Sequence, residues 1–322
     1  MFEHPPLWRL GALALIVAVT ACSPDSVTEP DVTGPQLAVA SELAAEISQH
    51  MDDVNAALAA GGDEYRVAMA EYVTRAEPGA EMGNTVIARD LGNKRLSTQF
   101  VEGDPRRAWS GPGANAVTYA VDRTGDAVPL FGGLGGAATD GAIARAMNSW
   151  NGLRCSELNM SRNPDFGLDI GVIAFLNGLG GSPFVFADVQ HAGWRDINFP
   201  GGILGVAFTF VWVDLNGPTD IDADGYADTA FREIYYDPSW AWGTDGSPGS
   251  IDVETVALHE AGHGLSQAHF GTVRIKNDGS VKASPRAVMN ALYSGPLRDL
   301  QGTDVGGHCA SWGNWNGDPG AN

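Results

Sequence analysis

Three histidines and one glutamate stand close together in the stretch TVALHEAGHGLSQAHF, residues 255–270. On a helix, His259 and His263 lie one turn apart on the same face, where two imidazoles can bind one metal ion. Glu260 lies about 100° round that helix, so its carboxylate reaches a water on the metal rather than the metal itself. Zinc lowers the pKa of such a water toward about 7, and a carboxylate can then take its proton. The pattern predicts metal-assisted hydrolysis of a peptide bond; its structural alternative is two surface histidines on an amphipathic helix.

A catalytic zinc needs a third protein ligand and an open fourth position. No glutamate follows Glu260 in the sequence, so the candidates are histidines and aspartates, such as the one in GTD at 302–304. His269 is the stronger candidate because it follows His263 by six residues, just after the helix has to end. A turned chain would bring it back to the same ion. His191 and His308 are expected to be packed, hydrogen-bonded histidines.

The segments around the histidines must position them. Residues 252–265 are compatible with a helix that has Asp252 as its N-cap. Upstream, we expect a helix at 139–153 capped by Thr139 or Asp140, and strands or β-rich runs at 115–122, 167–175, 205–214 and 232–237. A strand, a helix, several strands and a long helix predict an α+β fold class, with α/β as the close alternative.

The histidine segment also resembles a known family. HEAGHGLSQAH, at 259–269, resembles the metzincin zinc signature, and AVMNALY, at 287–293, is similar to the Met-turn of its matrixin branch. EIYYDPSWAWGTDG and the following IDVETVALHE are similar to the last sheet segments and the active-site helix of bacterial matrixin-like proteins. The resemblance covers roughly residues 107–312.

This resemblance implies a zincin-type catalytic domain with a twisted, mainly parallel sheet, three helices, and a cleft between an upper and a lower subdomain. It implies that His259, His263 and His269 bind zinc and that Glu260 is the general base. Met289 would form a hydrophobic floor under the metal. Tyr293 matches the family spacing in the segment that shapes the substrate pocket.

Two residues depart from the family pattern. Ser266 stands where the zinc signature has glycine; in a left-handed conformation its side chain costs on the order of 1 kcal/mol and could loosen His269. Ala291 replaces the proline that usually follows the Met-turn methionine by two residues. Since that segment helps to shape the pocket for the residue after the cleaved bond, Ala291 bears on substrate preference more than on chemistry.

A second cluster of possible ligands lies in DIDADGYAD, residues 220–228. Asp220, Asp222 and Asp224 alternate, Gly225 permits a sharp turn, and Asp228 could complete an oxygen cage for a hard cation such as calcium. The loop is not a full EF-hand, because Phe231 occupies the position of the bidentate glutamate. The alternative is a solvated acidic turn.

The N-terminus predicts export. A short segment ending in Arg9 leads into LGALALIVAVT, an apolar run too short to span a bilayer, and then VTAC resembles a bacterial lipobox. By that resemblance residues 1–21 are a signal peptide and Cys22 carries the lipid, with Ser23 favouring the outer membrane; an ordinary secretory signal is the alternative. Cys155 and Cys309 would then be free to form a disulfide, or remain as two buried thiols.

The rest of the chain divides by composition. Residues 22–36 are polar and contain prolines, which predicts a tether, and 316–322 predict a frayed tail. Residues 37–105 are expected to be a helical N-terminal segment, either a propeptide or a stalk, with a helical hairpin over 37–76 broken at Gly61 and Gly62. The catalytic domain would span 106–315.

The net charge limits the classes of partner that the protein can bind. The net charge is −20, from 39 acidic against 19 basic residues, which disfavours nucleic acid and leaves a lipid anchor as the contact with a membrane. The predicted function is a zinc-dependent endopeptidase that acts on proteins or peptides, with calcium as a structural ion. The alternative is a calcium-dependent surface binding or adhesion protein that kept the zincin fold without hydrolysis.

Overall fold

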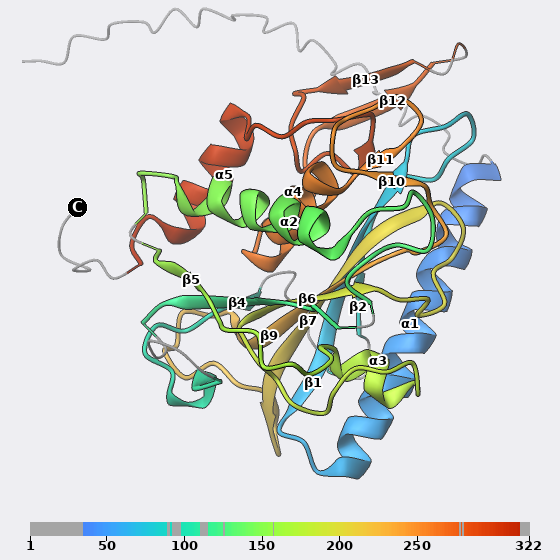
Figure 1. Cartoon of the computed structure of the whole chain (residues 1–322). Helices are drawn as coiled ribbons and strands as arrows, with labels where there is room; N and C mark the ends of the chain where they lie inside the picture. Colours follow the sequence, from blue (N-terminus) through green and yellow to red (C-terminus); the bar gives the residue numbers. More distant parts are fainter. Residues whose placement is uncertain are drawn as a thin grey trace, which may run out of the picture. The chain divides into compact units, whose positions relative to one another are not determined.

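A mixed β-sheet organises the chain (Figure 1). The computed structural model describes residues 35–88, 91, 98–109, 115–124, 126–156, 158–276, 278 and 280–315, and side chains from residue 43 onward. Along the sheet the strands follow the order β14 (Leu292–Tyr293), β1 (Tyr65–Arg75), β7 (Ile203–Asp214), β9 (Ala227–Tyr236), β6 (Val189–Trp194), β4 (Val117–Val121) and β5 (Met160–Arg162). Three short strands pair at its margins, namely β2 (Thr85–Ile87) with β1, β3 (Thr98–Gln99) with β9, and β8 (Gly217–Pro218) with β7.

Most neighbouring strands in this order are parallel. The pairs β14–β1, β9–β6, β6–β4 and β4–β5 are parallel, whereas β7 runs antiparallel to both β1 and β9. β7 and β9 are rich in aromatic and β-branched residues and are buried almost throughout, as expected for strands covered on both faces. The α+β class and the largely parallel sheet are therefore confirmed.

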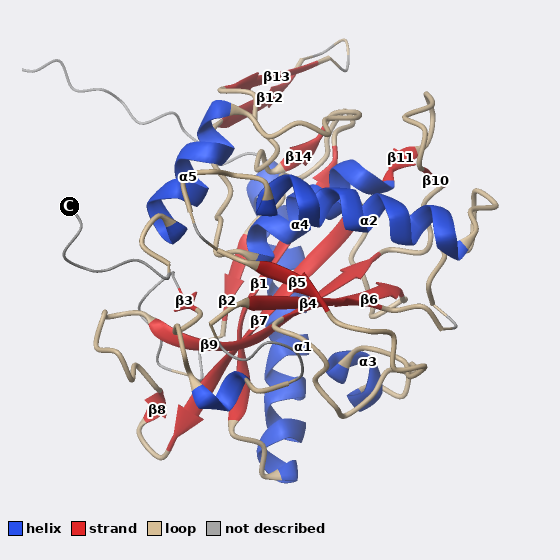
Figure 2. Cartoon of the chain, turned by 60° about the vertical axis from the view of Figure 1, so that its left-hand side comes forward, coloured by secondary structure: helices blue, strands red, loops and turns tan. Residues whose placement is uncertain are grey.

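Helices cover both faces of the sheet (Figure 2). α2 (Gly136–Asn151), α4 (Val253–Gly264) and α5 (Gly302–Trp312) supply or adjoin one core, and α1 (Pro35–Gly61) and α3 (Val172–Leu176) contribute to the other. The described residues contain five α-helices: α1, in the N-terminal segment that was expected to be helical, and four in the region where three were expected, because the short helix α3 was not predicted. Trp150 joins α2 to α4, since its indole N–H donates to the Leu258 carbonyl at 2.9 Å.

Small elements complete the described chain. A 3-10 turn, η1 (Pro105–Arg107), precedes β4, and the two-stranded ladders are β10 (Trp242–Gly243) with β11 (Ile251–Asp252) and β12 (Thr272–Ile275) with β13 (Val281–Ser284). Among the described residues, none of the helices combines the length and apolar character that crossing a membrane requires.

The expected helical hairpin over 37–76 is wrong in its second half. α1 ends at Gly61, as expected, but Tyr65–Arg75 form strand β1 between β7 and β14. The alanines and methionines of this segment suit a helix, but β7 and β14, its two neighbours along the sheet, lie more than a hundred residues away, where a local pattern cannot report them. Asn55 on α1 fixes the strand, because its side-chain amide exchanges hydrogen bonds of 2.7 and 2.9 Å with the backbone of Val67. A division of the chain at residue 105 therefore cuts through one sheet.

Two further local predictions fail. Residues 167–175 were expected to be β-rich but lead into helix α3, whose first N–H groups, those of Val172 and Ile173, donate to the carboxylate of Glu233 on β9. α2 begins at Gly136 rather than after Thr139, whose buried hydroxyl donates to the Ala127 carbonyl at 2.7 Å. In both places a tertiary hydrogen bond decides a local conformation. The predicted helix with Asp252 as N-cap, and the strands within 115–122, 205–214 and 232–237, are confirmed.

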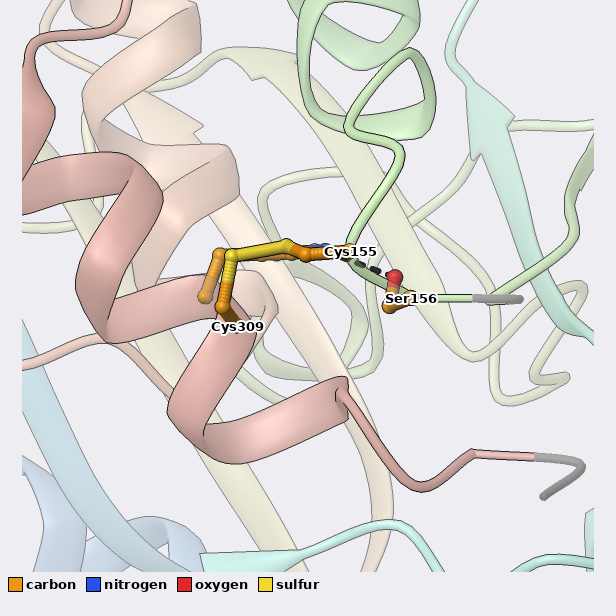
Figure 3. Close-up of a disulfide and its surroundings, with 4 residues drawn as sticks. Cys155, Ser156 and Cys309 are labelled. Carbon is orange, nitrogen blue, oxygen red and sulfur yellow. Dashed lines mark hydrogen bonds between the residues drawn. A yellow bond between two sulfur atoms is a disulfide. The ribbon is translucent and has the colours of Figure 1, made fainter. Parts of the chain in front are cut away.

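A disulfide joins Cys155, just after α2, to Cys309 on α5 (Figure 3). The two Cα atoms are 5.5 Å apart and the cysteines are 154 residues apart in sequence. The bond therefore ties the C-terminal helix to the segment that precedes β5. The predicted signal peptide at 1–21, the lipid anchor at Cys22, the tether up to residue 34 and the tail at 316–322 lie outside the described residues.

Candidate metal centre

Helix α4 positions the first two histidines. Asp252 caps it by accepting the Thr255 N–H at 3.0 Å, and Arg298 pairs with that same carboxylate. Every residue of α4 is buried, so His259 and His263 point from the helix into the protein rather than into solvent. This burial rules against the alternative of two surface histidines on an amphipathic helix.

The chain reverses directly after α4 and returns His269. Ser266 adopts the left-handed conformation, with φ +65°, as considered for the glycine position of the signature. Its hydroxyl compensates for this, because it donates to the Thr98 carbonyl at 3.1 Å and accepts from the Arg232 guanidinium at 3.0 Å. Arg232 is fully buried and also donates to the backbone carbonyl of His263. The turn is thus held from β9, and the substitution does not displace His269.

The three imidazoles converge. The Nε2 atoms of His259, His263 and His269 are each 3.1 Å from the other two. A point equidistant from the three nitrogens in their plane is about 1.8 Å from each, slightly less than the zinc–nitrogen distance of about 2.0–2.1 Å, so the three could hold one zinc ion. Three histidines are one of the sets of protein ligands that catalytic zinc sites use. The three histidines therefore fit the metal that the sequence predicts.

Backbone carbonyls orient two of the ligands. The Nδ1 atoms of His259 and His263 each lie 2.7 Å from a backbone oxygen, that of Val288 and that of Gln267 respectively. With Nδ1–H donating to a carbonyl, Nε2 keeps its lone pair for the metal. Burial lowers the pKa of His259 to about 3, and burial also lowers that of His269, so these rings are neutral at physiological pH and ready to bind a cation.

Glu260 lies beside the cluster as a buried carboxylate. Its exposure is 0%, and neither oxygen has a hydrogen-bond partner among the described residues. Burial, reinforced by the negative charge of Glu71, raises the pKa of Glu260 to about 8, while His263 and the Val73 N–H act in the opposite direction. An unpartnered buried carboxylate is costly to the fold, and a pKa near neutral is what a general base requires.

Glu71 is a site residue that sequence reasoning missed. It projects from β1, is 5% exposed, and places a carboxylate oxygen 3.4 Å from Nδ1 of His263. Although burial works to raise the pKa of Glu71, its interaction with His263 lowers it overall; reciprocally, burial works to lower the pKa of His263 and Glu71 raises it. No local signal marks this residue, because β1 reaches the histidines only through the sheet.

Met289 and Tyr293 both lie against helix α4 or its N-cap. Met289 is fully buried and packs against α4 at Gly262, where an added Cβ would lie 2.3 Å from its sulfur. The Tyr293 hydroxyl accepts the Asp252 N–H at 2.9 Å, and its ring borders a narrow cavity beside His259. The Ala291 carbonyl accepts the Gly83 N–H at 2.7 Å, so the position that departs from the family pattern forms a backbone contact with the N-terminal segment.

Asp304, the aspartate of GTD, supports the metal site without joining it. It is fully buried and its carboxylate accepts the N–H groups of Val288 at 3.0 Å, Met289 at 3.1 Å and Gln301 at 2.7 Å. It is absent from the group of ligand atoms formed by the three histidines in the described chain. The choice of His269 over an aspartate as third ligand agrees with this geometry.

The acidic loop gathers three of its four predicted ligands. Side-chain oxygens of Asp220, Asp222 and Asp224 lie within 4.8 Å of one another on the surface. Asp228 is instead buried and pairs with Arg106 at 2.8 Å. The structure therefore does not bring Asp228 into this group.

The remaining predicted histidines are packed as expected. Nδ1 of His191 lies 2.8 Å from the Tyr236 hydroxyl, and burial lowers the pKa of His191 to about 3. Nε2 of His308 lies 3.1 Å from the Ser156 hydroxyl. A comparison of the sequence with known protein families and with curated proteins finds no match.

Proposed function

We propose that this protein is a zinc-dependent endopeptidase of metzincin type. The observation that carries the proposal is the convergence of three Nε2 atoms, 3.1 Å apart, from two buried histidines and one half-buried histidine. They lie beside a buried carboxylate that has no hydrogen-bond partner among the described residues. The order of helices and strands, with the histidines on the last long helix before a buried methionine, is compatible with a zincin fold.

In this proposal His259, His263 and His269 hold the zinc ion. When bound, zinc polarises the carbonyl of the peptide bond and makes water more acidic. Glu260 takes a proton from the attacking water on one of its oxygens and passes it to the nitrogen of the leaving amine, so that no acyl group is attached to the protein. Val288, through its carbonyl, keeps His259 in the tautomer that binds metal.

Export remains part of the proposal. The disulfide between Cys155 and Cys309 supports it, because structural disulfides are rare in reducing compartments. We propose a lipid-anchored protein with Cys22 as its anchor; a secreted protein without that anchor is the alternative.

Replacement of Glu260 tests the activity. Glu260→Gln keeps the size of the side chain and removes its basicity, so zinc content measured by elemental analysis should equal that of the wild type. In protein freed of strand β1, as described in the next subsection, cleavage of a fluorescently labelled unfolded protein should fall by at least a hundredfold. Wild-type rates in this variant would refute the role of Glu260, and absence of zinc from the wild type would refute the metal site.

The second candidate is a calcium-dependent binding protein without hydrolysis, which the surface group of Asp220, Asp222 and Asp224 favours. Glu260 argues against it. Binding alone does not require a buried carboxylate that destabilises the fold without a partner. Protein that binds zinc and calcium but cleaves no substrate, in either its intact or its cut form as defined below, would favour this candidate.

A further inference from the structure

Strand β1 packs against α4, the helix that carries His259 and His263. From Tyr65 to Thr74 it pairs antiparallel with β7, and at Thr74 and Arg75 it also pairs parallel with β14, so it fills the space between these two strands (Figure 1). β14 follows the Met-turn segment, and β7 packs against α4. A peptide that approached the metal from this side would need the same space.

The side chains of β1 contact the catalytic groups themselves. Val73 is 2% exposed and lines the narrow cavity that His259, Val288 and Tyr293 also border. Its backbone N–H lies close enough to Glu260 to lower the pKa of that carboxyl, without forming a hydrogen bond to it. Two residues earlier, Glu71 reaches to 3.4 Å from the His263 ring. The backbone between Glu71 and Val73 therefore passes beside both Glu260 and the His263 ring.

The residue of β7 that pairs with Val73 also lies next to Glu260. Gly205 pairs with Val73, and a Cβ at Gly205 would lie 2.9 Å from an oxygen of Glu260. Glu260 is thus enclosed between the backbones of β1 and β7 rather than open to solvent. Beyond the C-terminal end of β1, a cavity of about 680 Å³ continues past Arg75 and Tyr293. The space that β1 occupies therefore continues into this cavity at the C-terminal end of the strand.

We infer that the space between β7 and β14 is a binding groove for an extended polypeptide, and that the described form fills this groove with its own strand β1. The inference rests on the proposed function. A substrate would add as a strand antiparallel to β7 and parallel to β14, with a small aliphatic side chain in the place of Val73. Because β1 and a substrate would use the same backbone hydrogen bonds of β7, they exclude each other. The chain is latent until β1 leaves.

Two exposed turns bracket the strand. Gly62, between α1 and β1, and Gly79, after β1, are exposed, and no atom lies within 4 Å of a Cβ added at either position. Recognition sites for a sequence-specific protease can be inserted at both turns of the full chain. Cutting at both sites and gel filtration under mild denaturant release the segment that contains β1. The matched control carries the insertion at Gly62 alone, so the strand stays attached through Gly79.

A second control holds the strand in place. Arg66 pairs with Val211 across the antiparallel ladder, so Arg66→Cys with Val211→Cys can form a reversible disulfide. After cutting at both turns, this variant retains β1 until a mild reductant opens the clamp. The clamp also works in the uncut chain, which keeps the inference testable if the cut chain does not remain folded.

Turnover of a labelled unfolded protein and binding of a peptide are the two measurements. We expect doubly cut protein freed of β1 to turn over at least tenfold faster than intact or singly cut protein, and clamped protein to remain inactive until reduced. A synthetic peptide of residues 65–75 should inhibit the freed protein. In the Glu260→Gln background the same peptide should bind, and a version with Val73→Asp should bind at least tenfold more weakly.

The outcomes separate the two proposals. Equal turnover by intact and freed protein, or turnover by the clamped uncut chain, would overturn the inference while leaving the peptidase proposal intact. Absence of turnover in every form, with the peptide still binding the Glu260→Gln protein in a Val73-dependent manner, would overturn the peptidase proposal and retain the groove. Absence of both turnover and peptide binding by a folded, freed protein would overturn both.

Discussion

Asp304→Asn tests a residue that supports the metal site without being a metal ligand. The Asp304 carboxylate accepts three buried backbone N–H groups, two from Val288 and Met289 and one from Gln301. The amide keeps one acceptor oxygen but turns the other into a donor that faces N–H groups. At least one bond to a charged acceptor is lost and one buried donor loses its partner, which costs about 2–4 kcal/mol in free energy of unfolding. For a domain of this size we expect the melting temperature to fall by about 4–8 °C.

The same change should weaken zinc binding, although Asp304 contacts no ligand. The Val288 N–H donates to Asp304 and the Val288 carbonyl accepts from His259, so a shift of this residue misorients the imidazole. Loss of such support typically lowers metal affinity by about 10–100-fold. Competition against a chelating dye measures the affinity, and calorimetry the melting temperature. Asp299→Asn, at an exposed aspartate nearby, is the control. If both variants matched the wild type in affinity and melting temperature, the proposed chain from Asp304 to His259 would be wrong.

Three other changes address separate parts of the molecule. Gly205→Ala places a Cβ 2.9 Å from a Glu260 oxygen, so turnover by protein freed of β1 should fall at least tenfold with zinc content unchanged; Gly201→Ala, which meets no atom within 4 Å, should behave as wild type. Replacing Cys155 and Cys309 together by serine removes a link between residues 154 positions apart, and loop entropy predicts a loss of about 5 kcal/mol, measurable by urea unfolding. Calcium binding at the acidic loop remains a prediction: added calcium should raise the melting temperature of the wild type but not of Asp222→Asn.

The zinc ligands could be predicted because their geometry is largely local. His259 and His263 share a helical face by spacing alone, and the helix is recognisable from its N-cap and its period. His269 needed one assumption, a reversal at Ser266, and the chain does reverse there with φ +65°. What the local pattern could not supply is the buried Arg232, on β9, that holds the reversal by pairing with the Ser266 hydroxyl.

The role of the N-terminal segment could not be predicted, because it depends on pairing across the sheet. Residues 65–75 read as helical by composition, yet they are buried between β7 and β14. Helix α3 is the opposite case: its segment was expected to be β-rich but forms a helix, because Glu233, about sixty residues later, accepts its first N–H groups. A single sequence carries no record of such partners. For that reason neither the position of Glu71 beside His263 nor the position of β1 between β7 and β14 could be predicted from the sequence.

One segment connects the metal to the groove. Residues 287–293 supply the Val288 carbonyl to His259, place Met289 against α4, and end in β14, which pairs with β1 at Thr74 and Arg75. An element that contacts both a ligand and the strand makes their binding interdependent, and thermodynamic linkage requires the effect to be equal in both directions. If zinc tightens the fit of residues 65–75 in the groove by some factor, those residues must tighten zinc by the same factor. Zinc affinity measured on freed protein with and without the 65–75 peptide, and peptide affinity with and without zinc, should therefore change by one common ratio.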